Sequence, residues 1–167
     1  AGAYNAVEYL IQTGCKRIMY FSSPMQLEVA HRRYQGWRDA LQHYQLWRGT
    51  DDIIICDTRD HAMEITPQIL NSSDRPDAIF CVNDHCASGV LYAAQQLGIS
   101  VPDQLAICGF SDALLARITT PMLTTVEQHG AEIGQRAMGC LLKRVVGVQT
   151  TPHAELGSAD LIVGGAA

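Results

Sequence analysis

Short apolar runs alternate with longer segments in which apolar residues recur at helical spacing along most of this chain. The short runs are continuously apolar, which is typical of strands covered on both faces; they span residues 17–21, 53–56, 78–82 and 105–108. Helical spacing marks residues 4–11, 27–44, 60–70, 84–97 and 131–146. Two further short strands are expected at residues 124–126 and 161–163.

Turn and capping residues divide this pattern into elements. Gly14 and Gly98 stand where helices end, and Asn83 or Asp84 can cap the helix that begins there. Pro67 either kinks the helix at residues 60–70 or ends it early. The alternation predicts an α/β fold, a parallel sheet with helices on both faces and right-handed crossovers. Ligands bind such sheets outside the carboxyl ends of the strands.

Length and composition change this picture little but exclude some functions. The chain has 167 residues, 47% of them hydrophobic, which suits one domain or two small lobes. No segment is long and apolar enough to cross a bilayer, so we expect no membrane partner. The formal net charge of -5 provides no basic field for phosphate backbones, so any DNA contact must come from another segment.

The six cysteines are scattered and form no Cys-x-x-Cys pair. Several lie in the apolar runs, where free thiols behave as small hydrophobes, and this favours a reducing, cytoplasmic compartment. The chain opens directly in a helical pattern without an initiator methionine or a secretory signal. We therefore expect it to be a piece of a longer protein.

Catalytic and cofactor motifs are missing from the sequence. There is no Gly-x-Ser-x-Gly elbow, no glycine-rich phosphate loop after a strand, and no motif that ties a cysteine to a histidine. His85 and Cys86 are adjacent but lack a second pair at metal-ligand spacing. We expect no enzyme activity, no metal and no cofactor.

Five blocks of sequence, read in order, resemble the effector-binding domain of LacI/GalR-type bacterial transcriptional regulators. They are residues 1–11 with 14–18 (GCKRI), 33–37 (RYQGW), 76–84 with 87–89, 98–103 with 107–110, and 121–126 with Gly134 and Leu141-Leu142. Cys15 stands where the family usually has histidine. Each block is weak alone, but together they cover nearly the whole chain.

The resemblance implies a periplasmic-binding-protein-like domain of two α/β lobes with an effector in the cleft between them. The chain, residues 1–167, would then be a partial effector-binding domain without the helix-turn-helix segment that binds operator DNA. Residues 1–15 and 122–147 would belong to the amino-terminal lobe, and residues 16–121 and 148–167 to the carboxyl-terminal lobe. The Thr/Pro turns at 119–121 and 150–152 are the candidate boundaries.

Three of the expected ligand-binding residues are Arg33, Asn83 and Thr58. From spacing alone Arg33 is better interpreted as an exposed helix arginine, but the resemblance places it in the cleft, where a guanidinium suits bidentate contact with oxygens. Asn83 is assigned to the ligand by resemblance, and Asp84 to a helix cap or to a supporting role. The family often has a stacking aromatic residue where Thr58 stands, so that platform is absent here.

Ser111 and Asp112 depart from the family pattern. Many members have an aspartate directly after the Gly-Tyr/Phe pair, whereas Gly109-Phe110 is followed here by serine, with the carboxylate one residue later. Either Ser111 and Arg33 bind an anionic effector that the missing carboxylate no longer repels, or Asp112 replaces that carboxylate and favours a neutral sugar.

The resulting prediction is a ligand-sensing domain that binds a small sugar or sugar acid and controls operator binding allosterically, as a homodimer. The alternative is a periplasmic sugar-binding protein of a transport system, which shares the two-lobed fold. The six dispersed cysteines weigh against that oxidising compartment.

Overall fold

The computed structural model describes residues 1–148 and 157–167. The elements in chain order are α1 (Gly2–Gln12), β1 (Ile18–Ser22), α2 (Glu28–His43), β2 (Ile53–Ile55), α3 (Arg59–Leu70), β3 (Ala78–Cys81), α4 (Asp84–Gln96), β4 (Ala106–Cys108), α5 (Leu114–Ile118), β5 (Thr125–Glu127), α6 (Gly130–Val145) and β6 (Asp160–Ile162). The predicted elements are all found close to their expected bounds, and the short helix α5 was not predicted. Pro67 lies inside α3, which continues to Leu70.

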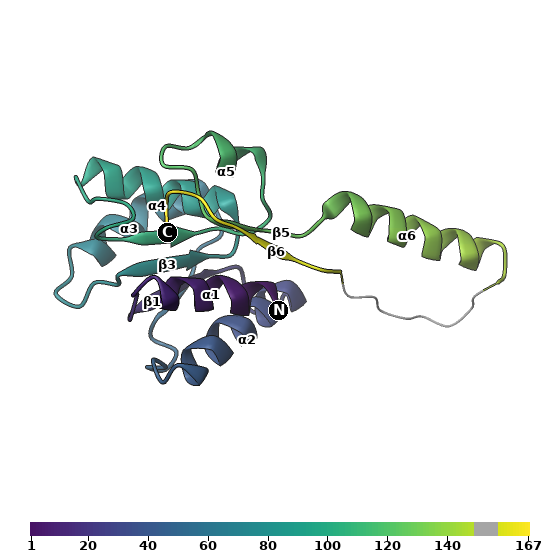
Figure 1. The fold of residues 1–167 in the computed structure, drawn as a ribbon, viewed down its shortest axis with the longest axis horizontal. Coiled ribbons are helices and arrows are strands. Elements are labelled where there is room, and N and C mark those ends of the chain that lie inside the picture. Colours follow the sequence, from purple (N-terminus) through teal and green to yellow (C-terminus); the bar gives the residue numbers. More distant parts are fainter. Residues whose placement is uncertain (149–156) are drawn as a thin grey trace.

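A four-stranded parallel sheet forms the centre of the body, in the order β2-β1-β3-β4. Helices α1 and α2 pack together on one side of it, and α3 and α4 on the other (Figure 1). The predicted α/β fold, a parallel sheet with helices on both faces, is therefore confirmed.

Successive strand residues face opposite sides of the sheet and so build two separate cores. Tyr20 and Phe80 lie on the side of α1 and α2 with Trp37, whose indole nitrogen donates to the Ile18 carbonyl at 3.0 Å. Phe21 lies on the side of α3 and α4. This alternation explains why the strands read as continuously apolar in the sequence.

The expected division into lobes placed residues 1–15 with residues 122–147. In the structure, α1 packs on the sheet beside α2, where Ala6, Val7 and Leu10 are fully buried. Its apolar face is covered by the same core that holds Trp37. The division into lobes stays a prediction.

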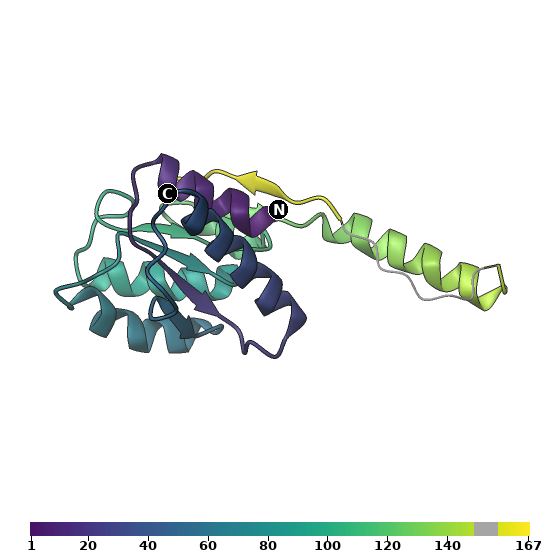
Figure 2. The ribbon, with the colours of Figure 1, turned by 90° about the horizontal axis from the view of Figure 1, so that it is seen from below.

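Strands β5 and β6 pair antiparallel and lead out of the body to α6 (Figures 1 and 2). Thr124, just before β5, forms a parallel bridge with Cys108 at the end of β4, which joins the pair to the main sheet. Helix α6 stands away from the body, and none of its residues is buried. Its amphipathic pattern is therefore left uncovered by the described part of the chain.

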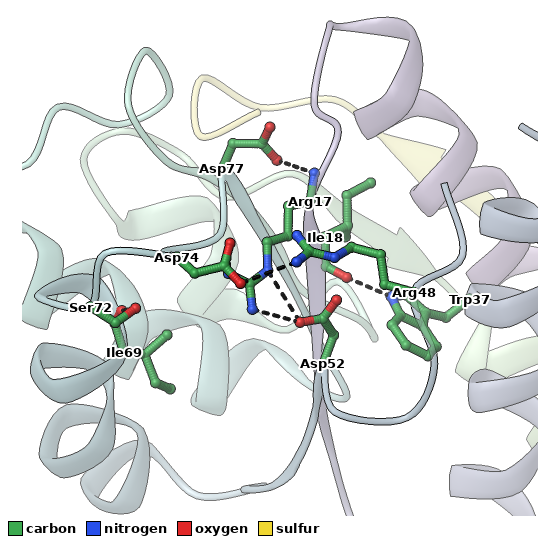
Figure 3. A network of polar contacts seen from close by, with 9 residues as sticks. All are labelled: Arg17, Ile18, Trp37, Arg48, Asp52, Ile69, Ser72, Asp74 and Asp77. Carbon is green, nitrogen blue, oxygen red and sulfur yellow. Dashed lines mark hydrogen bonds and ion pairs between the residues drawn. The ribbon is translucent and has the colours of Figure 1, made fainter. Parts of the chain in front are cut away.

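A polar network holds the amino ends of the strands (Figure 3). Arg17 precedes β1 and pairs with Asp52 at 2.9 Å and with Asp74 at 2.6 Å. Asp77 precedes β3 and accepts from the backbone nitrogens of Lys16 at 2.7 Å and Arg17 at 2.9 Å. These contacts fasten the edge of the sheet opposite to the carboxyl ends, where ligands are expected.

Candidate ligand-binding site

Arg33 joins three segments at the carboxyl edge of the sheet. Its side chain extends from α2, and one terminal nitrogen donates to the carbonyl of Val82, directly after β3. The other donates to the side-chain oxygen of Gln128, directly after β5, at 3.3 Å. The guanidinium also lies over the ring of Phe110, which follows β4. The expected site residue is thus half-buried and oriented by groups from three different segments.

Ser111 is connected to Arg33 through Gln128. The amide nitrogen of Gln128 donates to the Ser111 hydroxyl at 3.0 Å, while its oxygen accepts from Arg33. Ser111 is exposed and has a φ of 113°, an uncommon backbone conformation for a residue with a side chain. The uncharged side chain of Gln128 therefore bridges two of the expected residues, Arg33 and Ser111.

A hollow of about 420 Å³ opens beside Arg33, a volume in the range of small-molecule sites. The residues that line it come from α1, α2 and the loops after β4 and β5: Ala1, Gly2, Ala3, Glu28, Val29, Arg32, Arg33, Phe110 and Gln128. Phe110 and Gln128 were not predicted as site residues. Phe110 reads as the apolar end of a strand, and nothing in the sequence distinguishes Gln128.

Asn83 acts within the protein as the cap of α4. Its side-chain oxygen accepts from the backbone nitrogen of Cys86 at 2.8 Å, and its amide nitrogen donates to the carbonyl of Asp57 at 2.8 Å. These contacts occupy one acceptor and one donor and tie the loop after β2 to the start of α4. Asn83 directly follows Val82, whose carbonyl accepts from Arg33. The recorded contacts of Asn83 include none with the side chain of Arg33.

Thr58 has a similar capping role at the start of α3. Its hydroxyl accepts from the backbone nitrogen of His61 at 3.3 Å, and the residue is exposed. Thr58 does not line the hollow beside Arg33. Its expected contact with a ligand stays a prediction.

Asp84 is a buried carboxylate that holds the loop after β4. One oxygen accepts from the Thr125 hydroxyl at 2.6 Å and the other from the backbone nitrogen of Ala113 at 2.7 Å. Burial raises the pKa of the Asp84 carboxyl above its ordinary value. A Cβ on Gly109 would lie 2.2 Å from an Asp84 oxygen, so only glycine allows this approach. Asp84 thus supports the position of Phe110 and Ser111.

Asp112 is paired inside this loop. Its carboxylate forms an ion pair with Arg117 of α5, and its side chain is only 2% exposed. The backbone nitrogen of Asp112 donates to the Thr125 hydroxyl at 3.2 Å. The structure therefore brings Asp112 together with Arg117 and not with Arg33.

The Arg33 guanidinium forms no recorded ion pair in the described part of the chain, and the nearby Asp84 carboxylate acts on it through space. Burial lowers the pKa of the Arg33 guanidinium, but its ordinary value is so high that the group stays charged. Within residues 1–148 and 157–167, no group of three metal-ligating side chains could hold a metal ion. The described helices also include none that is long and apolar enough to span a membrane.

A parallel α/β body with a ligand-sized hollow at the carboxyl ends of its strands defines a small-molecule-binding domain. The comparison with known families agrees: residues 7–166 match the periplasmic binding protein-like domain. The chain belongs to this family, and the relatives and solved structures that it resembles are LacI-type transcriptional regulators.

The relatives are bacterial repressors. The chain is 34% identical over 164 residues to the HTH-type transcriptional repressor CytR of Escherichia coli K12. The alignment covers 98% of the chain and 48% of CytR. It is 32% identical over 148 residues to the repressor PurR of Vibrio vulnificus CMCP6, covering 86% of the chain and 43% of PurR. The chain thus spans about half the length of these curated relatives.

Solved structures agree with this family. A LacI-family regulatory protein from Chloroflexus aggregans matches with a TM-score of 0.91 and 33% identity, over 99% of the chain and 60% of that protein. The transcriptional regulator CelR in complex with cellobiose matches with a TM-score of 0.93 and 26% identity, over 99% of the chain and 51% of CelR. The expected resemblance to LacI/GalR-type regulators is confirmed.

Proposed function

We propose that this chain is the ligand-sensing part of a LacI-type, DNA-binding transcriptional regulator of the cytoplasm. Its effector is a small sugar or sugar acid held beside Arg33, and effector binding controls the affinity of the protein for operator DNA. The observation that carries this proposal is the half-buried Arg33, held by Val82, Gln128 and Phe110 at the wall of a ligand-sized hollow. The repressor relatives support the regulatory half of the proposal.

Two residues of the site, Arg33 and Ser111, offer hydrogen-bond donors to the effector. Arg33 has five N–H donors, of which the recorded hydrogen bonds use two, and the Ser111 hydroxyl is exposed. Vicinal hydroxyls or a carboxylate of a sugar derivative can accept from both residues. Asn83 and Thr58 cap the adjacent helices α4 and α3, and we include them among the residues that contact the effector.

The regulatory step couples this site to the segment that carries α6. Gln128 contacts Arg33 and lies between β5 and α6. An effector that changes the contacts of Gln128 therefore acts at the point where the chain leaves the body toward α6. Residues 122–147 would then move as part of the amino-terminal lobe relative to the body. Such coupling requires an effector that binds one arrangement more tightly than the other.

Operator DNA is contacted by a segment other than this acidic chain, in a homodimer. The test uses the longest native protein that contains these residues. Isothermal titration calorimetry measures the binding of neutral sugars, sugar acids and nucleosides, and a gel-shift assay measures operator binding with and without each binder.

A sugar or sugar acid that binds and changes operator affinity by at least about tenfold is the expected result, since allosteric couplings are typically about 1–3 kcal/mol. Binding only of nucleosides contradicts the proposed effector class. Sugar binding by a protein without operator affinity contradicts the regulator and favours a periplasmic sugar-binding protein.

A further inference from the structure

Two carboxylates face each other in the last residue pair of the β5–β6 ladder. The register places Glu127 of β5 directly opposite Asp160 of β6. Side chains of directly opposed residues lie on the same face of a sheet, and like charges in such a pair repel each other. This pair is also the one nearest to α6, because β5 ends at Glu127 and α6 begins at Gly130 (Figure 1). The ladder therefore carries an unfavourable pair at the point where the chain leaves the body.

His129 lies between these two carboxylates. Its Nε2 atom is 2.7 Å from the Asp160 carboxylate, and its Nδ1 atom is 3.8 Å from the Glu127 carboxylate. Within the described residues, the recorded ion pairs of both carboxylates are with this one imidazole. A protonated imidazole attracts both carboxylates, whereas the neutral ring has a single N–H to donate and no charge. The balance of charge in this pair therefore depends on one proton.

The backbone of His129 fixes the ring to the start of α6. The residue has a φ of 51° and a ψ of 53°, a left-handed conformation in which histidine is found more often than most residues with a side chain. Its carbonyl accepts from the backbone nitrogen of Ile133 at 3.1 Å, in the first turn of the helix. A change in the contacts of the ring is therefore passed directly to α6.

The other charged groups near the ring are engaged elsewhere. Glu132 of α6 is paired with Arg136. Arg117 of α5 acts on Glu127 through space, but its recorded ion pair is with Asp112. These groups leave the imidazole as the recorded cation between the two opposed carboxylates.

The same surroundings favour the protonated ring. The pKa of the His129 imidazole is raised above its ordinary value of about 6.5, first by the hydrogen bond to Asp160 and then by the charges of Glu127 and Glu132. The protonated form therefore persists to a higher pH than in a free histidine.

We infer that His129 is a proton-dependent latch, which closes the last pair of the β5–β6 ladder when it is charged and lets this pair open when it is neutral. Opening separates Glu127 from Asp160 and frees the first turn of α6 from β6. Gln128, the residue before the latch, contacts Arg33, so the change reaches the candidate site. The inference goes beyond the proposed function, because the latch responds to pH with or without an effector.

Hydrogen–deuterium exchange of the longest native protein that contains these residues tests the latch. Exchange is followed by mass spectrometry between about pH 5.5 and about pH 8.5 and corrected for the intrinsic effect of pH on exchange. Peptides that cover residues 125–133 and 158–162 report the latch, and peptides from β1 and β3 report the body. Protection at the latch should fall by about two- to fivefold as the pH rises, since exposed ion pairs change an equilibrium constant by such factors. Protection of the body should stay constant.

Two substitutions at His129 separate its charge from its shape. His129→Gln removes the charge and should leave the latch weakly protected at both ends of the pH range. His129→Lys carries a charge throughout this range and should keep the latch protected at both ends. His31→Gln, on α2 with its ring against the neutral Gln35, is the matched control and should keep the native response to pH.

Removal of the two carboxylates should have the opposite result. The double variant Glu127→Gln with Asp160→Asn lacks the repulsion and should stay protected at both ends of the pH range. Loss of the histidine thus leaves the pair open, loss of the carboxylates leaves it closed, and each change abolishes the response to pH. A residue with only a structural role would not give this contrast.

The pH series of the native protein decides the inference even where a variant does not fold. Protection at the latch that is constant with pH overturns it, as does a response to pH that survives His129→Gln. Lost protection in a folded double variant also overturns it. None of these measurements uses an effector or operator DNA, so their failure leaves the proposed function in place.

Discussion

The guanidinium carbon of Arg33 lies 4.0 Å from the centroid of the Phe110 ring. This contact links helix α2 to the loop after β4, and it places a cation on the edge of the core. Phe110 is only 6% exposed and also packs against Phe80, with ring centroids 6.2 Å apart. One aromatic side chain thus belongs both to the core and to the candidate site.

Replacing Phe110 by leucine separates these two roles. Phe110→Leu should weaken binding of the effector by about 3- to 30-fold, because a cation over an aromatic face is worth about 0.5–2 kcal/mol. It should also lower the free energy of unfolding by about 1 kcal/mol. Phe21→Leu, buried on the other side of the sheet, is the control: a similar loss of stability with unchanged affinity is expected. Equal losses of affinity in both variants would contradict a direct role of Phe110.

Gly109 should tolerate no side chain because of Asp84. Gly109→Ala places a methyl group 2.2 Å from a carboxylate oxygen that is already held by Thr125. We expect a loss of about 1–3 kcal/mol in the free energy of unfolding, measured by urea denaturation. Gly134→Ala, in α6 with no atom near its Cβ, should not destabilise the protein. An unchanged urea midpoint for Gly109→Ala would contradict the close approach.

Asp77 should stabilise the amino edge of the sheet (Figure 3). Asp77→Ala leaves the backbone nitrogens of Lys16 and Arg17 without their acceptor, which should cost about 1–3 kcal/mol in the free energy of unfolding. Glu28→Ala, which breaks an exposed ion pair with Arg32, should cost less than about 1 kcal/mol. If urea denaturation showed that Asp77→Ala and Glu28→Ala lower the free energy of unfolding by the same amount, Asp77 would not be a structural acceptor.

His129 should make the junction between β5 and α6 sensitive to pH. The hydrogen bond to Asp160 of β6, at 2.7 Å, raises the pKa of the His129 imidazole above its ordinary value, and Glu127 and Glu132 act in the same direction. Because the folded pKa is raised, the stabilisation is full below the ordinary pKa of about 6.5 and is lost as the pH rises through the folded pKa. NMR titration of the His129 ring should show a lower pKa in Asp160→Asn. An unchanged pKa would contradict the pairing.

The cysteine thiols should differ in reactivity by their burial. A hydrogen bond with Cys86 and burial raise the pKa of the Cys56 thiol, and burial raises that of Cys108. Because the reagent must also reach the sulfur, iodoacetamide at pH 8 should modify the half-buried Cys15 and Cys140 at least about tenfold faster than the buried Cys56 and Cys108. Peptide mass spectrometry follows each site, and in urea all sites should react alike. Rapid labelling of Cys108 in the folded protein would contradict its placement in the core.

Local patterns were sufficient for most of the fold. The continuous apolar runs around Tyr20 and Phe80 predicted strands buried on both sides, and the helical spacing predicted α1 to α4 and α6. Helix α5 was missed because Leu114–Ile118 is too short to show a helical period. The antiparallel pairing of β5 with β6 was also missed, because nothing local tells a short strand which partner it will take.

The candidate site was only partly predictable. Arg33 and Ser111 were expected from a resemblance, and the structure connects them through Gln128. Asn83 and Asp84 could each be a cap or a ligand from sequence alone; the structure makes Asn83 the cap and engages Asp84 with Thr125. Asp112 is paired with Arg117 in the structure, and its expected contact with a ligand stays a prediction.

The sequence by itself determined the order of strands and helices and the family, because hydrophobic periodicity and short motifs are properties of neighbouring residues. Only the tertiary structure decided that Phe110 lies under Arg33 and that Gln128 bridges Arg33 and Ser111. These residues are far apart in the chain and meet because parallel strands end at one edge of the sheet. The surroundings of the Arg33 charge depend on how every neighbouring side chain is engaged, and that is decided by packing.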